Sequence, residues 1–113
     1  MAFNGDLQFA KARSPLFGYN KTYLIWAAEL GRISQVEFLL ECDADVNAQD
    51  IFGATATHYA VGNNNFKMVN LLVKNGANLR LQDKKGRTAL MAADTSGFLN
   101  IRECLQAAQA DRS

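Results

Sequence analysis

Few residues in this chain are of the types that carry out covalent or acid–base chemistry. Among 113 residues there are one histidine, His58, and two cysteines, Cys42 and Cys104. A cysteine activated by a neighbouring histidine is a nucleophile, so a thiolate enzyme would have to use His58. Asp43 and Asp45 are a pair of carboxylates to consider for acid–base work. They stand in the run CDADVN, where aspartate ordinarily caps the backbone groups of a turn.

Signatures of catalysis and of metal binding are missing. The chain has no G-x-x-x-x-G-K-[ST] phosphate loop and no G-x-S-x-G nucleophile elbow. One histidine and two distant cysteines do not make a zinc-type ligand cluster. We therefore expect a protein that is not an enzyme, with no cofactor, no metal and no small-molecule substrate. We expect both thiols to be reduced and inert, with a disulfide as the alternative.

Composition and charge indicate a globular domain without a strong preference for polyanions. Hydrophobic residues make up 49% of the chain, charged residues 20%, and the net charge is +1. There is no apolar run near the roughly 20 residues that span a bilayer, and the first 15 residues lack the apolar core of a secretory signal. These features predict an intracellular protein, cytoplasmic or nuclear, that does not act on membranes.

Three threonines mark an internal repeat of 33 residues. Thr22, Thr55 and Thr88 each precede a short helical pattern, and a threonine hydroxyl can accept a hydrogen bond from a free backbone N–H at a helix start. Nine positions after each threonine comes glycine or asparagine, the residues that best adopt the left-handed conformation that ends a helix. These helix-ending residues are Gly31, Asn64 and Gly97.

A second helical pattern follows each stop, at residues 33–41, 66–74 and 99–107, with apolar residues at the spacing of one helix face. Turn chemistry follows the first two, as aspartate and glycine at residues 50–53 and again at 83–86. A helix pair this short cannot bury its own apolar face, so such units must stack. The sequence predicts an all-α stack of about three helix–turn–helix repeats, and the polar residues of the last helix suit a terminal cap.

The unit resembles the ankyrin repeat over about residues 19–108. The resemblance rests on the D-x-x-G-x-T-(P)-L-H-x-A core and the L-L-x-x-G-A-D-x-N run, with many positions agreeing in phase. It implies an ankyrin-repeat solenoid with hairpin-like finger turns, divided into repeats at 19–49, 50–82 and 83–113. It also implies a structural, hydrogen-bonding role for His58. The departures from the family pattern are Tyr23, Ala56 and Ala89 in place of proline, Thr57 in place of a core leucine, and Ile25 and Met91 in place of histidine.

Residues 1–18 do not align as a fourth repeat, yet they include apolar residues such as Phe3, Leu7 and Phe9. We expect this segment to cap the exposed side of the first repeat. It would do so as a helix up to about Lys11 that is broken before Pro15. A disordered tail is the alternative.

The resemblance implies a protein–protein interaction module that binds through its concave surface, as an adaptor or inhibitor. The alternative is a regulatory ankyrin segment of a larger enzyme, channel or transcription regulator. Family contacts come mostly from the fingertips and from the inner faces of the first helices. The matching residues are Tyr19, Lys21, Trp26, Glu29, Leu30, Ile51, Phe52, Ala54, Tyr59, Asn63, Lys84, Lys85, Arg87, Thr95 and Ser96.

The finger residues themselves indicate what kind of partner would bind. Ile51 and Phe52 stand side by side in a turn, so at least one should be exposed as a binding residue unless Phe52 packs on the next finger. The third finger carries Lys84, Lys85 and Arg87 beside a single acid. An apolar middle next to a basic finger predicts an extended partner segment with apolar and acidic residues. One basic finger is not the stripe that nucleic acid requires.

Asn47 is a candidate modification site by resemblance alone. The run LLECDADVN at residues 39–47 is similar to the turn segment that asparagine hydroxylases act on in some ankyrin proteins. The usual role of asparagine at this place is to hydrogen-bond the backbone of the turn.

Overall fold

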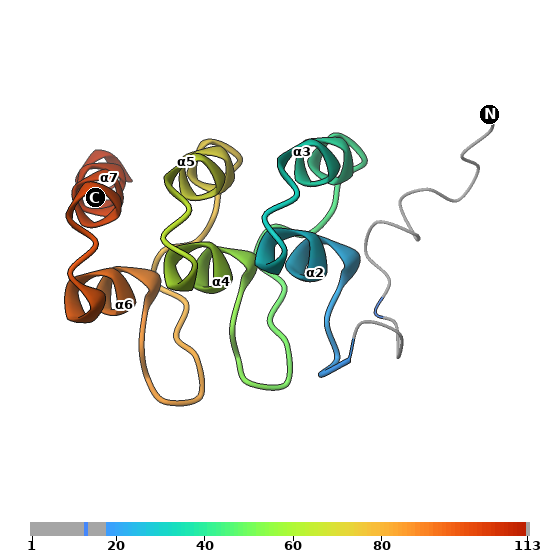
Figure 1. Ribbon diagram of the computed structural model, residues 1–113, viewed down its shortest axis with the longest axis horizontal. Coiled ribbons are helices and arrows are strands. Elements are labelled where there is room, and N and C mark those ends of the chain that lie inside the picture. Colours follow the sequence, from blue (N-terminus) through green and yellow to red (C-terminus); the bar gives the residue numbers. More distant parts are fainter. Residues whose placement is uncertain (1–12, 14–17, 113) are drawn as a thin grey trace.

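Six helices in two parallel rows make up the computed structural model, which describes Arg13 and residues 18–112. The inner row, beside the finger turns, holds the first helix of each repeat, and the outer row holds the second (Figure 1). The helices are α2 (Tyr23–Glu29), α3 (Ile33–Glu41), α4 (Ala56–Gly62), α5 (Phe66–Lys74), α6 (Ala89–Ser96) and α7 (Leu99–Arg112). The predicted all-α solenoid of three helix–turn–helix repeats is confirmed. The helix expected up to Lys11 lies outside the described residues.

The inner helices begin and end where the repeat predicts. The hydroxyls of Thr22, Thr55 and Thr88 each accept from the backbone N–H three residues on, which satisfies a donor that the first turn leaves free. Each helix then stops within about two turns at a left-handed residue, with φ of 75° at Gly31, 54° at Asn64 and 74° at Gly97. The short helices therefore follow from local sequence signals.

Small residues let the inner helices approach one another closely. Ala27, Ala60 and Ala93 hold the same position in three successive repeats, and all three are fully buried. Helix α4 packs against α2 on one side and α6 on the other. Thr57, which stands where the ankyrin pattern that the sequence resembles has a core leucine, is also buried, and its hydroxyl has no hydrogen-bond partner among the described residues. The larger members of the core are Leu24, Ile25, Val36, Leu39, Val61, Met68, Val69, Leu72, Ile101 and Leu105.

The C-terminal end of the stack is polar at positions where the inner repeats are apolar. Val61 on α4 and Val69 on α5 are fully buried, and these helices pack against α6 and α7 of the third repeat. One repeat later the same positions are Asp94 and Arg102, whose side chains form an ion pair at 3.4 Å. These residues give α6 and α7 the polar outer face that the sequence predicts for a terminal cap.

The second and third fingers are built by the same hydrogen bonds. In the second finger, Oδ1 of Asp50 accepts from the N–H groups of Phe52 and Ala54. In the third finger, Oδ1 of Asp83 accepts from Lys85 and Arg87, at the same two spacings. These bonds fold each finger into a compact turn, as aspartate in a turn is expected to do.

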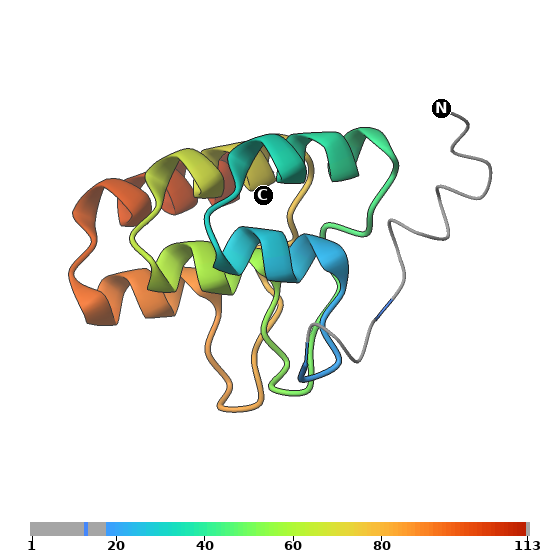
Figure 2. The ribbon, with the colours of Figure 1, turned by 45° about the vertical axis from the view of Figure 1, so that its right-hand side comes forward.

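Backbone hydrogen bonds also join the fingers to one another. The N–H of Ile51 donates to the carbonyl oxygen of Tyr19 at 2.9 Å, and the N–H of Lys84 donates to that of Phe52 at 3.0 Å. The three fingers consequently form one continuous row on the lower side of the stack in Figure 1, and Figure 2 shows the same turns hanging below the inner helices.

A side chain from the N-terminal segment completes this row. Gln49 donates through Nε2 to the carbonyl oxygens of Gly53 and Gln82, at 2.9 and 3.1 Å. Arg13 donates through Nη1 to those of Asn20 and Gln49, at 2.6 and 2.9 Å. Asn20 and Gln49 lie 33 positions before Gly53 and Gln82, so Arg13 makes the same pair of bonds one repeat earlier. Arg13 thus closes the N-terminal end of the finger row.

The described part of the chain has no helix that is both long enough and apolar enough to cross a bilayer. In the same residues no three side chains of histidine, cysteine, aspartate or glutamate gather as a group that could hold a metal ion.

Candidate functional site

A groove of about 640 Å³ runs along the inner side of the fingers. Residues of all three fingers and of the three inner helices line it, so it crosses the repeats. The lining residues are Tyr19, Lys21, Glu29, Phe52, Ala54, His58, Tyr59, Gly62, Asp83, Lys84, Lys85, Arg87, Ala92 and Ser96.

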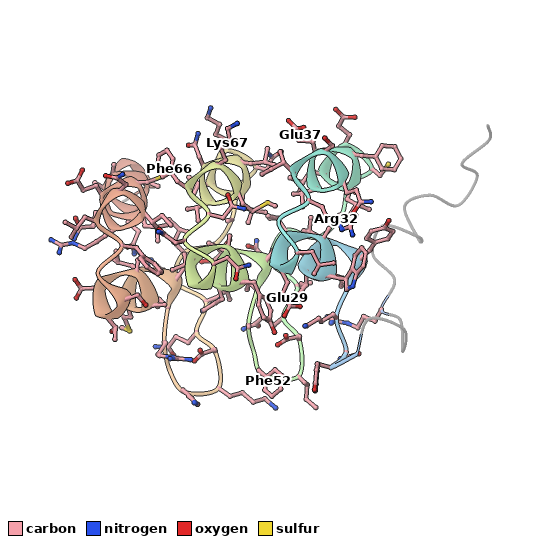
Figure 3. All side chains as sticks on the ribbon, viewed as in Figure 1. Glu29, Arg32, Glu37, Phe52, Phe66 and Lys67 are labelled. Carbon is pink, nitrogen blue, oxygen red and sulfur yellow. The ribbon has the colours of Figure 1, made fainter. Side chains whose placement is uncertain are left out.

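Two aromatic rings stand exposed at the fingertips. The rings of Tyr19 and Phe52 contact each other with centroids 5.2 Å apart, which is ordinary aromatic pairing. Yet 61% of Tyr19 and 52% of Phe52 remain exposed, and their neighbour Ile51 is 50% exposed. Figure 3 shows Phe52 at the tip of its finger. The ring of Phe52 therefore packs on Tyr19 of the finger before it, and both Ile51 and Phe52 are exposed. We refer to Tyr19 and Phe52 as the aromatic pair.

Lys21 lines the groove but is almost entirely buried in it. Its ammonium lies over the rings of Tyr59 and Tyr19, at 4.9 and 5.4 Å from their centroids, and forms an ion pair with Glu29. Only 5% of the residue is exposed. Aromatic faces and a carboxylate both attract an ammonium, so its charge is satisfied within the protein. Lys21 holds the first finger to α2 and α4.

Tyr59 ties the second finger to α4. Its hydroxyl donates to Oδ2 of Asp50, the buried aspartate that builds that finger. Burial raises the pKa of Tyr59, and the hydrogen bond and negative charge of Asp50 and the charge of Glu29 raise it further. Tyr59 therefore stays protonated and keeps donating this bond, so it is a positioning residue as well as part of the lining.

The third finger carries the basic side of the groove. Arg87 pairs with Asp83 in its own finger, at 3.1 Å between Nη2 and Oδ2. Burial alone would raise the pKa of Asp83, but hydrogen bonds from the backbone of Arg87 and Lys85 and the guanidinium of Arg87 outweigh it, so the pKa is lowered. Lys84 and Lys85 are exposed, and their ammonium groups have no ion-pair partner among the described residues.

His58 joins two repeats, and its predicted structural role is confirmed. Nδ1 accepts from the N–H of Thr55 at 3.1 Å, which completes the capping box of α4. Nε2 lies 2.9 Å from the carbonyl oxygen of Arg87 in the next repeat, and since a carbonyl only accepts, Nε2 is the donor. Both ring nitrogens are therefore occupied, Nδ1 in capping α4 and Nε2 in holding the third finger beside it, although the ring also lines the groove.

The structure brings most of the predicted binding residues together. On the groove lie Tyr19, Lys21, Glu29, Phe52, Ala54, Tyr59, Lys84, Lys85, Arg87 and Ser96, and outside its lining lie Trp26, Leu30, Ile51, Asn63 and Thr95. Trp26 packs instead against Tyr23 and Arg32, with 5.6 Å between the two ring centroids. Asn63 donates through Nδ2 to the carbonyl oxygen of Glu29 at 2.7 Å, so it links the ends of two inner helices.

Four lining residues were not among the predicted contacts: His58, Gly62, Asp83 and Ala92. The repeat register could have found two of them. Ala92 holds the position of Tyr59 one repeat later, and Gly62 holds the position of Glu29. Asp83 and His58 were expected to act within the fold, and they do so while also facing the groove.

The remaining residues singled out by sequence lie away from the groove lining. Cys42, at the end of α3, and Cys104, within α7, are free thiols, and burial raises the pKa of Cys104, which keeps it protonated. Asp45 accepts from the N–H of Asn47 at 2.9 Å, the turn role expected of it. Oδ1 of Asn47 accepts from the N–H of Asn78 at 2.7 Å and so links two repeats. Hydroxylation of Asn47 stays a prediction.

Comparison with known sequences shows the class of protein that this fold and groove define. The family described as "Ankyrin repeats (3 copies)" matches residues 24–112, and the chain belongs to the ankyrin repeat family. Ankyrin repeats generally act as protein–protein interaction modules, and the family is generally non-catalytic.

Individual relatives include large notch proteins. The chain is 48% identical over 64 residues to "Neurogenic locus notch homolog protein 2" of Homo sapiens, which is 57% of this chain and 3% of that protein. It is 44% identical over 72 residues to "Neurogenic locus notch homolog protein 1" of Xenopus laevis, which is 64% of this chain and 3% of that protein. The chain thus spans about 3% of the length of these relatives.

Proposed function

We propose that this chain binds a partner protein through the groove, as an adaptor or an inhibitor. The observation that carries the proposal is the aromatic pair. More than half of each residue is exposed, although Tyr19 and Phe52 lie on adjacent fingers that are fixed by backbone hydrogen bonds. Exposed aromatic side chains held on a rigid support are typical hot spots of protein interfaces.

The rigidity of the fingers supports the same proposal. Backbone bonds join neighbouring fingers, Lys21 and Tyr59 tie two of them to the inner helices, and His58 ties the third. A surface that is already ordered loses little conformational entropy when a partner binds. The groove is therefore suited to recognition, and the groups that could act as acid or base, such as His58 and Asp50, are occupied in holding the fold.

The second candidate function is that of a regulatory ankyrin segment within a larger enzyme, channel or transcription regulator. The observation that favours it is the comparison, because the chain matches only about 3% of the notch proteins that it resembles. In that case the partner of the groove is another part of the same protein. We propose a cytoplasmic or nuclear location for either function. Measuring the mass of the native protein in its source cells would separate the two.

Two phenylalanines provide the test of the groove. Phe52 stands at the fingertip, and Phe66 stands on the outer helix α5, away from the fingers (Figure 3). They are matched in exposure, at 52% and 47%. For a partner recovered by affinity purification from the native source, Phe52→Ala should weaken binding about 30-fold, the size of a hot-spot loss. Phe66→Ala should change it less than twofold. A loss confined to Phe66→Ala would place the partner on the outer helices and overturn the proposal.

A further inference from the structure

The charges of the groove show what chemistry a partner must supply. Most of its charged groups are paired within the protein: Lys21 with Glu29, and Arg87 with Asp83. Lys84 and Lys85 are left, both exposed and without an ion-pair partner among the described residues. The groove therefore offers a partner two uncompensated positive charges.

The apolar part of the groove lies directly beside these charges. The aromatic pair belongs to the first two fingers, and the N–H of Lys84 donates to the carbonyl oxygen of Phe52 at 3.0 Å. The two lysines consequently stand one finger further along the row than Phe52. A partner that crosses the fingers meets the aromatic pair and the two lysines in sequence.

The distance between the two features sets a spacing for the partner. Neighbouring packed helices are about 8–10 Å apart, and the fingers follow the helices of their repeats. An extended chain advances about 3.3 Å per residue. One repeat therefore corresponds to about three residues of an extended partner, and the flexible stems of the lysines allow about one residue on either side.

We propose that the groove selects an extended segment with one large apolar residue and a carboxylate side chain about three positions away. The apolar residue packs on Tyr19 and Phe52, and the carboxylate pairs with Lys84 or Lys85. This inference rests on the proposed function and deepens it, since it names the partner's chemistry. Charge complementarity at an interface contributes mainly to specificity, which makes the acidic position a selective feature.

The test is a selection from a display library of random 12-residue peptides against the full chain. The same selection is made on the variant Lys84→Glu plus Lys85→Glu. A matched control is Lys67→Glu plus Lys74→Glu, since both of these lysines are exposed and lie on α5 outside the groove lining. Thermal melting of each variant establishes that it is folded before selection.

The proposal predicts three results. Peptides selected on the unaltered chain share an apolar residue and an Asp or Glu two to four positions away. On the Lys84/Lys85 reversal the apolar residue is kept, and a basic residue replaces the acid at the same spacing. On the α5 control the original pattern is unchanged. For a selected peptide, replacing the acid by alanine weakens binding about fivefold, in keeping with an exposed ion pair.

Other results separate failure of this inference from failure of the proposed function. If binding depends on Phe52 but the selected peptides show no acidic preference, the inference is wrong and the groove remains the binding surface. The same conclusion follows if binding depends on Phe52 and the selected sequences do not change on the reversal of Lys84 and Lys85. If binders are insensitive both to Phe52→Ala and to the reversal, the groove itself is not the binding surface. Failure to select any binder on the folded chain would contradict the inference, while the comparison of Phe52→Ala with Phe66→Ala on a purified partner tests the proposed function separately.

Discussion

The second and third fingers share the same backbone conformation but present different side chains at their tips. Asp50 and Asp83 make the same turn bonds, with lengths that agree within about 0.1 Å. Yet the second finger presents Ile51 and Phe52, and the third presents Lys84 and Lys85. The scaffold residues of a finger are thus fixed by the fold, while the tip residues vary without altering it. If the groove binds a partner as we propose, we expect its specificity to come from the tip residues.

The two fingers also differ in how the second oxygen of the aspartate is satisfied. In the third finger, Arg87 reaches Oδ2 of Asp83 from within the same turn. In the second finger the equivalent of Arg87 is Ala54, which is too short, and the hydroxyl of Tyr59 on α4 takes its place. The second finger is therefore tied to the helix row through its aspartate, and the third is held through the carbonyl of Arg87 by His58.

Substitution of the finger glycines should give the largest difference in unfolding free energy between the second and third fingers. Gly53 and Gly86 both have positive φ, 74° and 78°. A Cβ on Gly53 would lie 2.9 Å from the backbone nitrogen of Lys84, whereas a Cβ on Gly86 meets no atom within 4 Å. Gly86→Ala should lower the unfolding free energy by about 1 kcal/mol, the cost of the left-handed backbone. Gly53→Ala adds a backbone clash and should cost about 3 kcal/mol. Urea unfolding measures both, and equal losses would contradict the packed finger row.

Removing the side chain that bonds to Oδ2 of each finger aspartate should give a smaller difference in unfolding free energy between the two fingers. Tyr59→Phe leaves Oδ2 of the buried Asp50 without its donor and should lower the unfolding free energy by about 1–2 kcal/mol. Arg87→Ala removes an exposed guanidinium from Asp83 and should cost at most about 1 kcal/mol. The order of the two losses in chemical denaturation is the readout. A larger loss for Arg87→Ala would show that the third finger, not the second, depends more on its aspartate.

The contribution of Asp83 in the third finger to the pH dependence of stability should be the smallest of these effects. The pKa of Asp83 is lowered from its ordinary value of 3.8 by hydrogen bonds and by Arg87. Because the unfolded state then binds the proton more tightly, this stabilisation is present above pH 3.8 and is lost as pH falls below it, toward the lowered pKa. Asp83→Asn should flatten that part of an acid unfolding curve. An unchanged acid limb in Asp83→Asn would show that the carboxylate does not contribute.

Local signals in the sequence were sufficient to predict the fold. Contacts between repeats could not be predicted from them. The threonine caps, the left-handed stops and the finger turns depend on neighbours within a few residues, so Thr55 and Asn64 could be interpreted directly. Burial of Lys21 between Tyr19 and Tyr59 depends on how two repeats stack, which no local pattern encodes.

In the candidate site, too, local features could be predicted from the sequence and contacts between repeats could not. Exposure of Phe52 and of Lys84 and Lys85 follows from residue types in turns. Tyr19 was expected at a fingertip by resemblance alone, and its contact with Phe52 across two repeats was not predicted. The bonds of Arg13 depend on a side chain from outside the repeats that takes the place of a preceding Gln49 equivalent. Trp26 was expected on the binding surface by resemblance to the family's inner-helix contacts, but it packs on Tyr23 and Arg32.

If a partner lies in the groove against the fingertips, as we propose, site-specific photocrosslinking measures its position most directly. A photoreactive amino acid replaces Ile51, an exposed tip residue beside Phe52, or Lys67, an exposed residue on the outer helix α5. Crosslinking of the bound partner at position 51 and not at 67 is the predicted result. Crosslinking at position 67 and not at 51 would place the partner on the outer helices and contradict the account.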